Sequence, residues 1–292
     1  MRLSSTAGLA LHAPVALLGT GLLIALGLAR ERPALIALGV LGSIVYAAIV
    51  LRRPLRRMRA LRRPFPAPWR ELLRRRIRFY ERLDPAGRAR FERNVTIVLA
   101  DYRFEGIGVP IDDELRLLAA SGAAMLIHGL EGFEYPGVRS IVLYPNHFDE
   151  AYRVGAELPI AGMVHGQGPI VFSAAALRQG FSREKDGHNV ALHELAHVLD
   201  MADGSADGVP AILGASRTAP WSARLAEELL RVRKGRSPLR AYGGKSEAEL
   251  FAVAVEAFFE RPGILRRKRP ELYAALVEML ALDPLATHDA QE

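Results

Sequence analysis

The first 51 residues contain two long stretches without a charged side chain, and this feature most restricts what the chain can fold into. One stretch runs from Leu3 to Ala29 and the other from Pro33 to Leu51, with Arg30, Glu31 and Arg32 between them. A helix needs about 20 apolar residues to cross a bilayer, so each stretch is long enough. We expect a transmembrane helical hairpin rather than a cleaved signal peptide, because a second apolar stretch follows the first at once.

A dense group of basic residues follows the second stretch. Residues 52–76 contain eleven arginines and one acid, Glu71, whereas residues 77–292 carry more acids than bases. Basic residues that flank a membrane span stay in the cytoplasm. We therefore expect the chain to lie in a bacterial inner membrane with its folded part in the cytoplasm. Because the charge is concentrated beside the span, where it suits anionic lipid, no nucleic-acid partner is expected despite the net charge of +7.

The remaining sequence predicts one folded domain of the α+β class, rich in helices and with a small sheet. The expected organisation is a hairpin at 1–51, an arginine- and proline-rich juxtamembrane linker at 52–68, a catalytic domain at 69–284 and a tail at 285–292. Helices are expected from Asp84-Pro85 onward, at 113–125, 189–201, 221–234, 246–260 and 270–282, and strands at 138–144 and 169–173. The strand at 138–144 is also a candidate edge for pairing with an extended peptide.

One short motif carries recognisable chemistry. His193-Glu194-Leu195-Ala196-His197 is an HExxH sequence inside a predicted helix. Residues four apart lie on one face of a helix, so both imidazoles can reach the same metal ion, and Glu194 is placed to accept a proton from water. The chain has no cysteine, so a metal site must use nitrogen and oxygen ligands. This donor set suits zinc.

The sequence leaves three candidates for the third metal ligand. Asp203 would complete an HExxHxxGxxD pattern, but Asp200 stands where that pattern has its glycine. Asp200 itself better fits a carboxylate that orients an imidazole. Glu249 lies seven residues before Glu256 on one face of an apolar helix, and buried carboxylates need a partner or a metal. However, Ser246 and Glu249 also form a capping box, which alone would explain a glutamate there.

Several ordered blocks around the motif are familiar. They comprise 140–145, 168–171, HELAHVLDMADGSADGVP at 193–210, and the segment from Ala241-Tyr242 through 246–259. Together they resemble the Mlc titration factor A family of zinc metallopeptidases, whose catalytic domain is similar to that of anthrax lethal factor. The resemblance covers residues 69–284 and implies a zincin-like fold. It implies zinc bound by His193, His197 and Glu249.

The resemblance also implies roles for three further residues. Glu194 matches the catalytic base, Tyr242 matches the tyrosine that stabilises the oxyanion, and Glu256 is interpreted as a supporting carboxylate and a reserve third ligand. The leading hypothesis is a membrane-anchored, cytosol-facing zinc peptidase that hydrolyses a peptide or protein substrate. The alternative is a non-catalytic regulatory protein that sequesters a protein partner such as a transcriptional repressor. The intact Glu194 favours catalysis, because a pure binder needs no general base.

Overall fold

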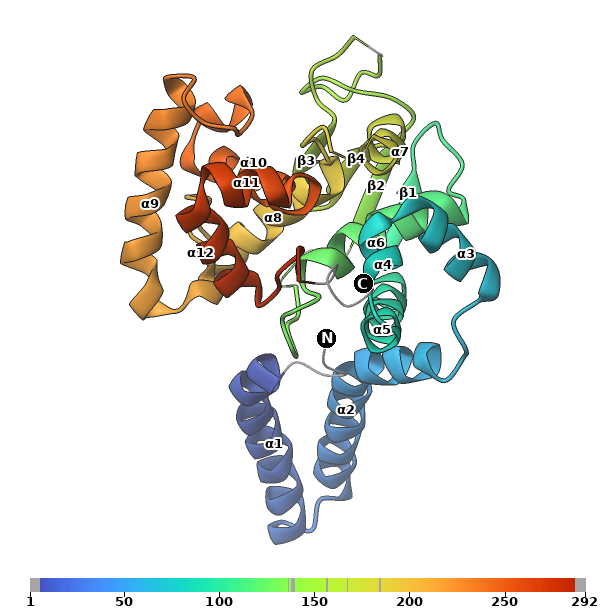
Figure 1. The fold of residues 1–292 in the computed structure, drawn as a ribbon. Coiled ribbons are helices and arrows are strands. Elements are labelled where there is room, and N and C mark those ends of the chain that lie inside the picture. The colour runs from blue at the N-terminus through green and yellow to red at the C-terminus, as the bar shows by residue number, and fades with distance from the viewer. Residues whose placement is uncertain are drawn as a thin grey trace. The chain divides into compact units, whose positions relative to one another are not determined.

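The chain forms two units in this computed structural model, one over Met1–Pro64 and one over Phe65–Glu292 (Figure 1). The structure describes residues 6–135, 137, 140–155, 157–166, 168–183 and 185–286. The start of the expected strand at 138–144 and most of the expected tail at 285–292 lie outside the described residues. The two units are described separately below.

The first unit consists of two helices, α1 (Thr6–Ala29) and α2 (Pro33–Leu61), which pack against each other. A Cβ atom on Gly27 would lie 2.6 Å from the side chain of Ile36, and one on Gly39 would lie 2.6 Å from that of Ile24. Glycine therefore lets the two backbones approach closely. The helix α2 continues to Leu61, well into the segment 52–68 that is expected to be a linker. This segment can be helical because arginine is a good helix former.

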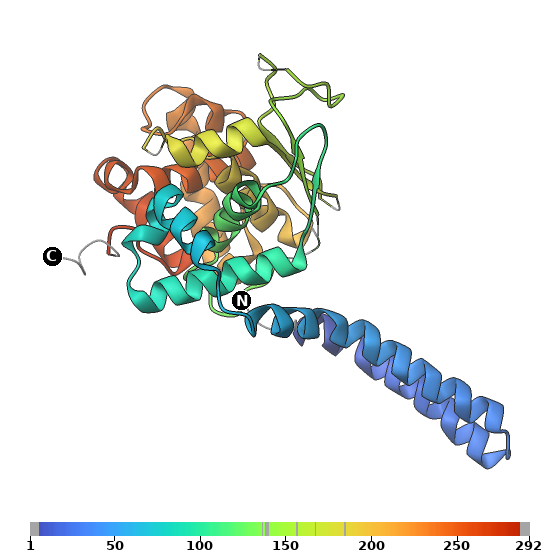
Figure 2. The same cartoon turned by 90° about the vertical axis from the view of Figure 1, so that its right-hand side faces the viewer.

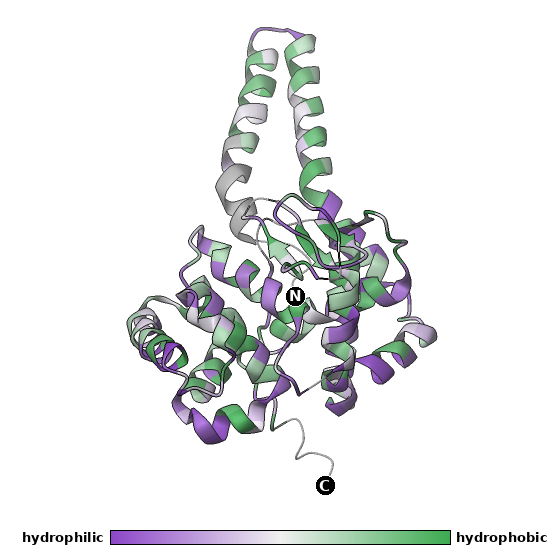
Figure 3. Cartoon of the chain, turned by 90° about the horizontal axis from the view of Figure 1, so that it is seen from above, coloured by the Kyte–Doolittle hydropathy of each residue, from purple (hydrophilic) through white to green (hydrophobic). Residues whose placement is uncertain are grey.

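The helix α2 is the one helix in the described part of the chain that is both long and apolar enough to cross a membrane. The apolar part of α1, Ala16–Ala29, is shorter than the same criterion requires. Large apolar side chains such as Leu38, Ile44 and Ile49 are exposed along α2, and Figure 3 shows its green, hydrophobic residues. The membrane-spanning hairpin remains a prediction.

The second unit is dominated by helices. They are α3 (Ala67–Arg76), α4 (Arg78–Arg82), α5 (Pro85–Asp101), α6 (Asp113–Leu126), α7 (Ala174–Ser182), α8 (Val190–Asp200), α9 (Ala215–Arg233), α10 (Glu247–Glu260), α11 (Pro262–Lys268) and α12 (Pro270–Leu280). Three short 3-10 turns are η1 (Met201–Asp203), η2 (Ala211–Leu213) and η3 (Ala241–Gly244). The caps explain where several begin: Asp84, Asn189 and Ser246 accept backbone N–H groups at the starts of α5, α8 and α10. The expected helix-rich α+β class is confirmed.

Four short strands form one mixed sheet in the order β1-β2-β4-β3. They are β1 (Arg103–Gly106), β2 (Ser140–Tyr144), β3 (Gly162–Val164) and β4 (Ile170–Ser173). The strand β2 pairs in parallel with both β1 and β4, so the prediction that it offers a free edge is wrong. The strand β3 pairs with β4 in antiparallel orientation and lies at the end of the sheet.

The helix α8 lies against α6, α10 and β3. Its approach to two of these elements depends on glycine. A Cβ atom on Gly122 of α6 would lie 2.7 Å from the side chain of Ala191, and one on Gly162 of β3 would lie 2.7 Å from that of Glu194. The ring of Phe79 in α4 lies edge to face with that of Phe259 in α10. Figure 2 shows the early, blue-green helices of this unit beside its late, red helices. The packing of α8 against α6, α10 and β3 places the HExxH segment in the interior.

Candidate metal centre

The helix α8 presents both imidazoles of the HExxH motif to one point. Asn189 caps this helix, and its Oδ1 accepts hydrogen bonds from the backbone N–H groups of Ala191 and Leu192. One turn apart, the rings of His193 and His197 have centroids 4.9 Å from each other, and their Nε2 atoms are 3.3 Å apart. The motif therefore folds as its four-residue spacing predicts.

The helix α10 supplies a third donor atom. Glu249 Oε2 lies 3.0 Å from His193 Nε2 and 3.5 Å from His197 Nε2. One donor atom from each of these three residues falls within 4.8 Å of the others, which is the arrangement of a metal site. Among the described residues, this is the group that brings three such donors together.

The chemistry of these donors fits a zinc ion. The Nδ1 atom of His193 is hydrogen-bonded to Glu256 at 2.7 Å, so in the neutral ring Nδ1 carries the proton and Nε2 directs its lone pair at the cluster. Two imidazole nitrogens and a carboxylate oxygen are ligands that zinc accepts. Three acceptor atoms so close together repel one another unless a cation or a proton lies between them. The site therefore suits a divalent metal.

Glu256 and Arg240 support this centre from behind. Glu256 is fully buried, accepts the backbone N–H of Asn189 at 2.6 Å, and forms an ion pair with the guanidinium of Arg240. A carboxylate behind a ligating histidine fixes the ring orientation and raises its basicity. The supporting role of Glu256 at a metal ligand stays a prediction. The sequence analysis missed Arg240, because nothing in its local sequence links it to a glutamate sixteen residues further along the chain.

Burial and neighbouring charges shift the acid–base behaviour of the centre. Burial, together with the charges of Glu249 and Glu256, raises the pKa of Glu194 to about 7, against the opposing effect of His193. Without a metal, burial raises the pKa of Glu249, but hydrogen bonds from the protonated rings of His193 and His197 outweigh it, and the pKa lies well below its ordinary value. A carboxyl group with a pKa near neutrality is suited to accept and return a proton.

Tyr242 approaches the centre from η3. Its hydroxyl oxygen lies 3.5 Å from Glu249 Oε1, and its ring centroid lies 5.8 Å from that of His193. The ammonium group of Lys245 lies 4.0 Å from the centre of the same ring. The side chain is 41% exposed, so its hydroxyl group is open to a ligand that enters from solvent.

The structure distinguishes between the alternatives for the third ligand. Ser246 Oγ accepts the backbone N–H of Glu249, so one half of the capping box is formed, while the Glu249 carboxylate turns to the histidines. Asp203 accepts hydrogen bonds from the backbone and hydroxyl of Ser205 and lies outside the cluster. Asp200 Oδ2 accepts the backbone N–H of Gly208 at 2.9 Å rather than an imidazole N–H, so its expected role at a histidine is not found.

The burial of Asp200 predicts that the stability of the fold depends on pH. Burial raises its pKa from 3.8 to about 6, against the hydrogen bond from Gly208, and its Oδ1 has no hydrogen-bond partner among the described residues. The folded state therefore holds the proton more tightly than the unfolded state. Stability from this group is present below pH 4 and is lost as the pH rises through about 6, by at most about 3 kcal/mol.

We expect Asp200→Asn to remove this dependence. Urea unfolding with a chelator present should show that the free energy of unfolding of D200N, relative to wild type, increases between pH 4 and pH 7. Glu150→Gln is the control, because Glu150 is exposed and is not among the groups that shift the pKa of Asp200. Equal pH profiles for D200N and wild type would contradict the burial argument.

The comparisons with known proteins agree with this geometry. A sequence profile of the glucose-regulated metallo-peptidase M90 family matches residues 52–280. A Synechocystis protein, slr2042, named only as an uncharacterized protein, is 31% identical over 79% of this chain and 89% of its own length. Mlc titration factor A of Edwardsiella ictaluri is 35% identical over 51% of this chain and 62% of its own length. Mlc titration factor A of Escherichia fergusonii is 32% identical over a similar share.

The family match spans the described helices of the second unit from α3 to α12 and includes the whole candidate centre. The resemblance to Mlc titration factor A is confirmed, whereas the similarity to anthrax lethal factor remains a prediction. The fold, the clustered donors and the sequence profile lead to one conclusion: the chain belongs to the glucose-regulated metallo-peptidase M90 family.

Proposed function

We propose that this protein is a zinc-dependent peptidase. The observation that carries the proposal is the convergence of His193, His197 and Glu249 beside the buried carboxyl group of Glu194. When bound, zinc supplies Lewis acidity that lowers the pKa of water from 15.7 to about 7 and polarises a carbonyl group. His193, His197 and Glu249 would hold the ion, as three protein ligands do in catalytic zinc sites.

Glu194 acts as the general base in this proposal. Its carboxylate accepts a proton from the attacking water and later returns it to the amine that leaves. A pKa near 7 suits both steps, because the group can gain and lose a proton at neutral pH. The hydroxyl group of Tyr242 donates a hydrogen bond to the oxyanion that develops on the substrate carbonyl. Its exposure to solvent and its approach to Glu249 support this role.

The strand β3 is proposed to seat the substrate. It lies at the end of the sheet and pairs only with β4 among the described strands, so an extended peptide could add to its other side. Gly162 of this strand lies directly against Glu194, where a Cβ atom would collide with the carboxylate side chain. A peptide paired with β3 would therefore pass close to the general base.

The first unit is proposed to anchor the protein in the bacterial inner membrane. Under this proposal α1 and α2 form a transmembrane hairpin at 1–51, the arginine-rich segment at 52–68 lies at the cytoplasmic surface, and the catalytic domain occupies 69–284. The hydropathy and exposed apolar side chains of α2 support membrane insertion. The eleven arginines of residues 52–76 support a cytoplasmic orientation.

Reporter fusions test this orientation. Green fluorescent protein fused after Glu292 is expected to fluoresce and to sediment with the membrane fraction, whereas alkaline phosphatase at the same position is expected to be inactive. Replacing all seven arginines between 52 and 63 by glutamine should reduce this bias, because it removes the basic charge beside the span. Active phosphatase in the wild-type fusion would place the domain in the periplasm and overturn the orientation.

A chelator experiment tests the catalytic proposal. The full chain, purified in a non-ionic detergent, is incubated with a peptide library before and after treatment with 1,10-phenanthroline. We expect cleavage to stop with the chelator and to return when zinc is added, since the ion is needed to polarise the carbonyl group. Cleavage that persists with no metal detectable by mass spectrometry would contradict the proposal.

The second candidate function is regulatory binding without catalysis. Relatives named Mlc titration factor A favour it, because their name refers to the removal of a protein partner from solution. The partner proposed for this chain would be a regulatory protein such as a transcriptional repressor. Stoichiometric zinc without any chelator-sensitive cleavage would favour this function over hydrolysis.

A further inference from the structure

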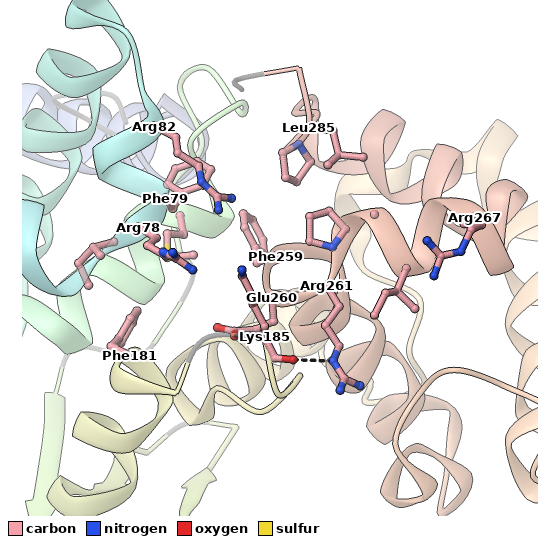
Figure 4. A pocket seen from close by; sticks show the side chains of 16 residues that line it. Arg78, Phe79, Arg82, Phe181, Lys185, Phe259, Glu260, Arg261, Arg267 and Leu285 are labelled. Carbon is pink, nitrogen blue, oxygen red and sulfur yellow. Dashed lines mark hydrogen bonds between the residues drawn. The ribbon is translucent and has the colours of Figure 1, made fainter. Parts of the chain in front are cut away.

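The second unit contains a cavity whose lining includes none of the candidate metal ligands. Its volume is about 350 Å³, within the range of small-molecule sites. Its walls come from α4, the loop after α7, the end of α10, α11 and the residues that follow α12. Figure 4 shows these side chains around a common space. None of the residues that line it is part of the metal centre.

The cavity is strongly basic. The described lining contains one acid, Glu260, and five cationic side chains, which are Arg78, Arg82, Lys185, Arg261 and Arg267. Glu260 is already engaged, because its two oxygens accept hydrogen bonds from the backbone N–H of Lys185 and from Asn189 Nδ2. The side chains of Arg82 and Arg267 form no ion pair with a described residue. A ligand that enters this cavity therefore meets uncompensated positive charge from separate elements.

The loop after α7, which carries Lys185, is held in a fixed position. Lys185 adopts a left-handed backbone conformation with a φ of 80°, which a residue with a side chain rarely takes. Two hydrogen bonds hold it there: its N–H donates to Glu260, and its carbonyl accepts from Arg261 Nε at 2.8 Å (Figure 4). Glu260 and Arg261 of the cavity wall therefore fix the backbone of Lys185. Less conformational entropy is lost when its ammonium group binds a ligand.

Aromatic rings supply an apolar part to the same cavity. Phe79 and Phe259 both line it, are both only partly buried, and lie edge to face with centroids 5.7 Å apart. An exposed aromatic ring offers a surface on which a flat ligand ring can stack. Arginine binds phosphate through paired N–H groups.

We propose that this cavity binds a phosphate monoester that carries a flat aromatic ring, as a nucleoside monophosphate does. The phosphate lies beside Arg82 and Lys185, Arg267 of α11 adds positive charge to the same cavity, and the ring lies against Phe79 and Phe259. The proposal goes beyond peptide hydrolysis and needs no metal at the other site. It can therefore fail or hold independently of the proposed function.

Calorimetric titration of the full chain in non-ionic detergent tests the proposal. The probes are adenosine 5′-monophosphate, inorganic phosphate and adenosine. We expect the monophosphate to bind at least about tenfold more tightly than either fragment, because it uses both halves of the cavity. Arg82→Gln should weaken its binding by about tenfold or more, since it removes a charge-assisted contact. Arg267→Gln should weaken it by a smaller factor, because it removes one positive charge of the lining. Arg266→Gln is the matched control for R267Q, because both arginines are exposed neighbours on α11 and only Arg267 lines the cavity.

Phe259→Leu separates the two halves of the site. This variant should lose affinity for the monophosphate while its affinity for inorganic phosphate stays unchanged. The proposal is overturned if the monophosphate does not bind at millimolar concentration, if R82Q and R267Q bind as R266Q does, or if inorganic phosphate binds equally well. Displacement by phosphatidic acid in the micelle, but not by the monophosphate, would assign the cavity to a lipid headgroup and also overturn it.

Discussion

Replacing Glu194 by glutamine is expected to abolish peptide cleavage while the metal stays bound. Glutamine has nearly the same shape, so it fits against Gly162 of β3, where a Cβ atom on residue 162 would lie only 2.7 Å from the side chain of residue 194. It cannot accept a proton from water, and loss of a general base typically lowers turnover by about 100- to 10,000-fold. The fold should be retained, because burial already disfavours the charged form of Glu194.

Two measurements on the same preparation check this result. The zinc content of E194Q, measured by mass spectrometry after dialysis, should equal that of wild type, and the rate of peptide cleavage should fall by the stated factor. Glu247→Gln, an exposed glutamate in the first turn of α10, should behave as wild type in both measurements. Wild-type turnover by E194Q would exclude Glu194 as the base.

Removing the carboxylate of Glu249 should release the metal. In Glu249→Ala only His193 and His197 remain as donors, and two imidazoles do not complete a zinc site. Loss of a residue that merely orients a ligand costs about 10- to 100-fold in metal affinity, so loss of a ligand should cost at least about 100-fold. Cleavage should fall with it, since the ion is required to polarise the carbonyl group.

The matched control for this variant is Glu247→Ala. Glu247 lies two residues earlier on the same helix and is exposed, so both variants remove one negative charge from the first turn of α10. Competition with a zinc-binding dye should show weakened binding in E249A alone. Stoichiometric zinc of wild-type affinity in E249A would mean that another acid completes the site, and Glu256 would be the first to test.

Local sequence signals predicted most of the helices and part of the centre. The cap residues Asp84, Asn189 and Ser246 mark where α5, α8 and α10 begin, because a side-chain oxygen at that position satisfies free N–H groups. The spacing of His193 and His197 predicts their convergence for the same local reason. These features depend only on residues a few positions apart.

The rest depends on contacts between distant segments. The acid that lies beside the two histidines could not be chosen from sequence, because the position of Glu249 rather than Asp203 next to them follows from the packing of α10 on α8. The strand β3 has only three residues, one of them glycine, and gives no periodic pattern to recognise. The order of strands also follows from tertiary pairing, so the sequence could offer β2 only as a candidate edge, and it lies in the interior of the sheet.

Asn189 gives the two sites a shared mechanical connection. Its side-chain amide donates to Glu260 in the wall of the basic cavity, its Oδ1 caps α8, and its backbone N–H donates to Glu256 behind His193. A ligand that displaces the side chain of Glu260 would also displace Asn189, which is hydrogen-bonded to it. Because Asn189 caps α8, the first turn of the helix that carries both histidines would shift. Occupancy of one site would then alter how tightly the other grips its ion, and by thermodynamic reciprocity the ion would alter the affinity of the cavity by the same factor.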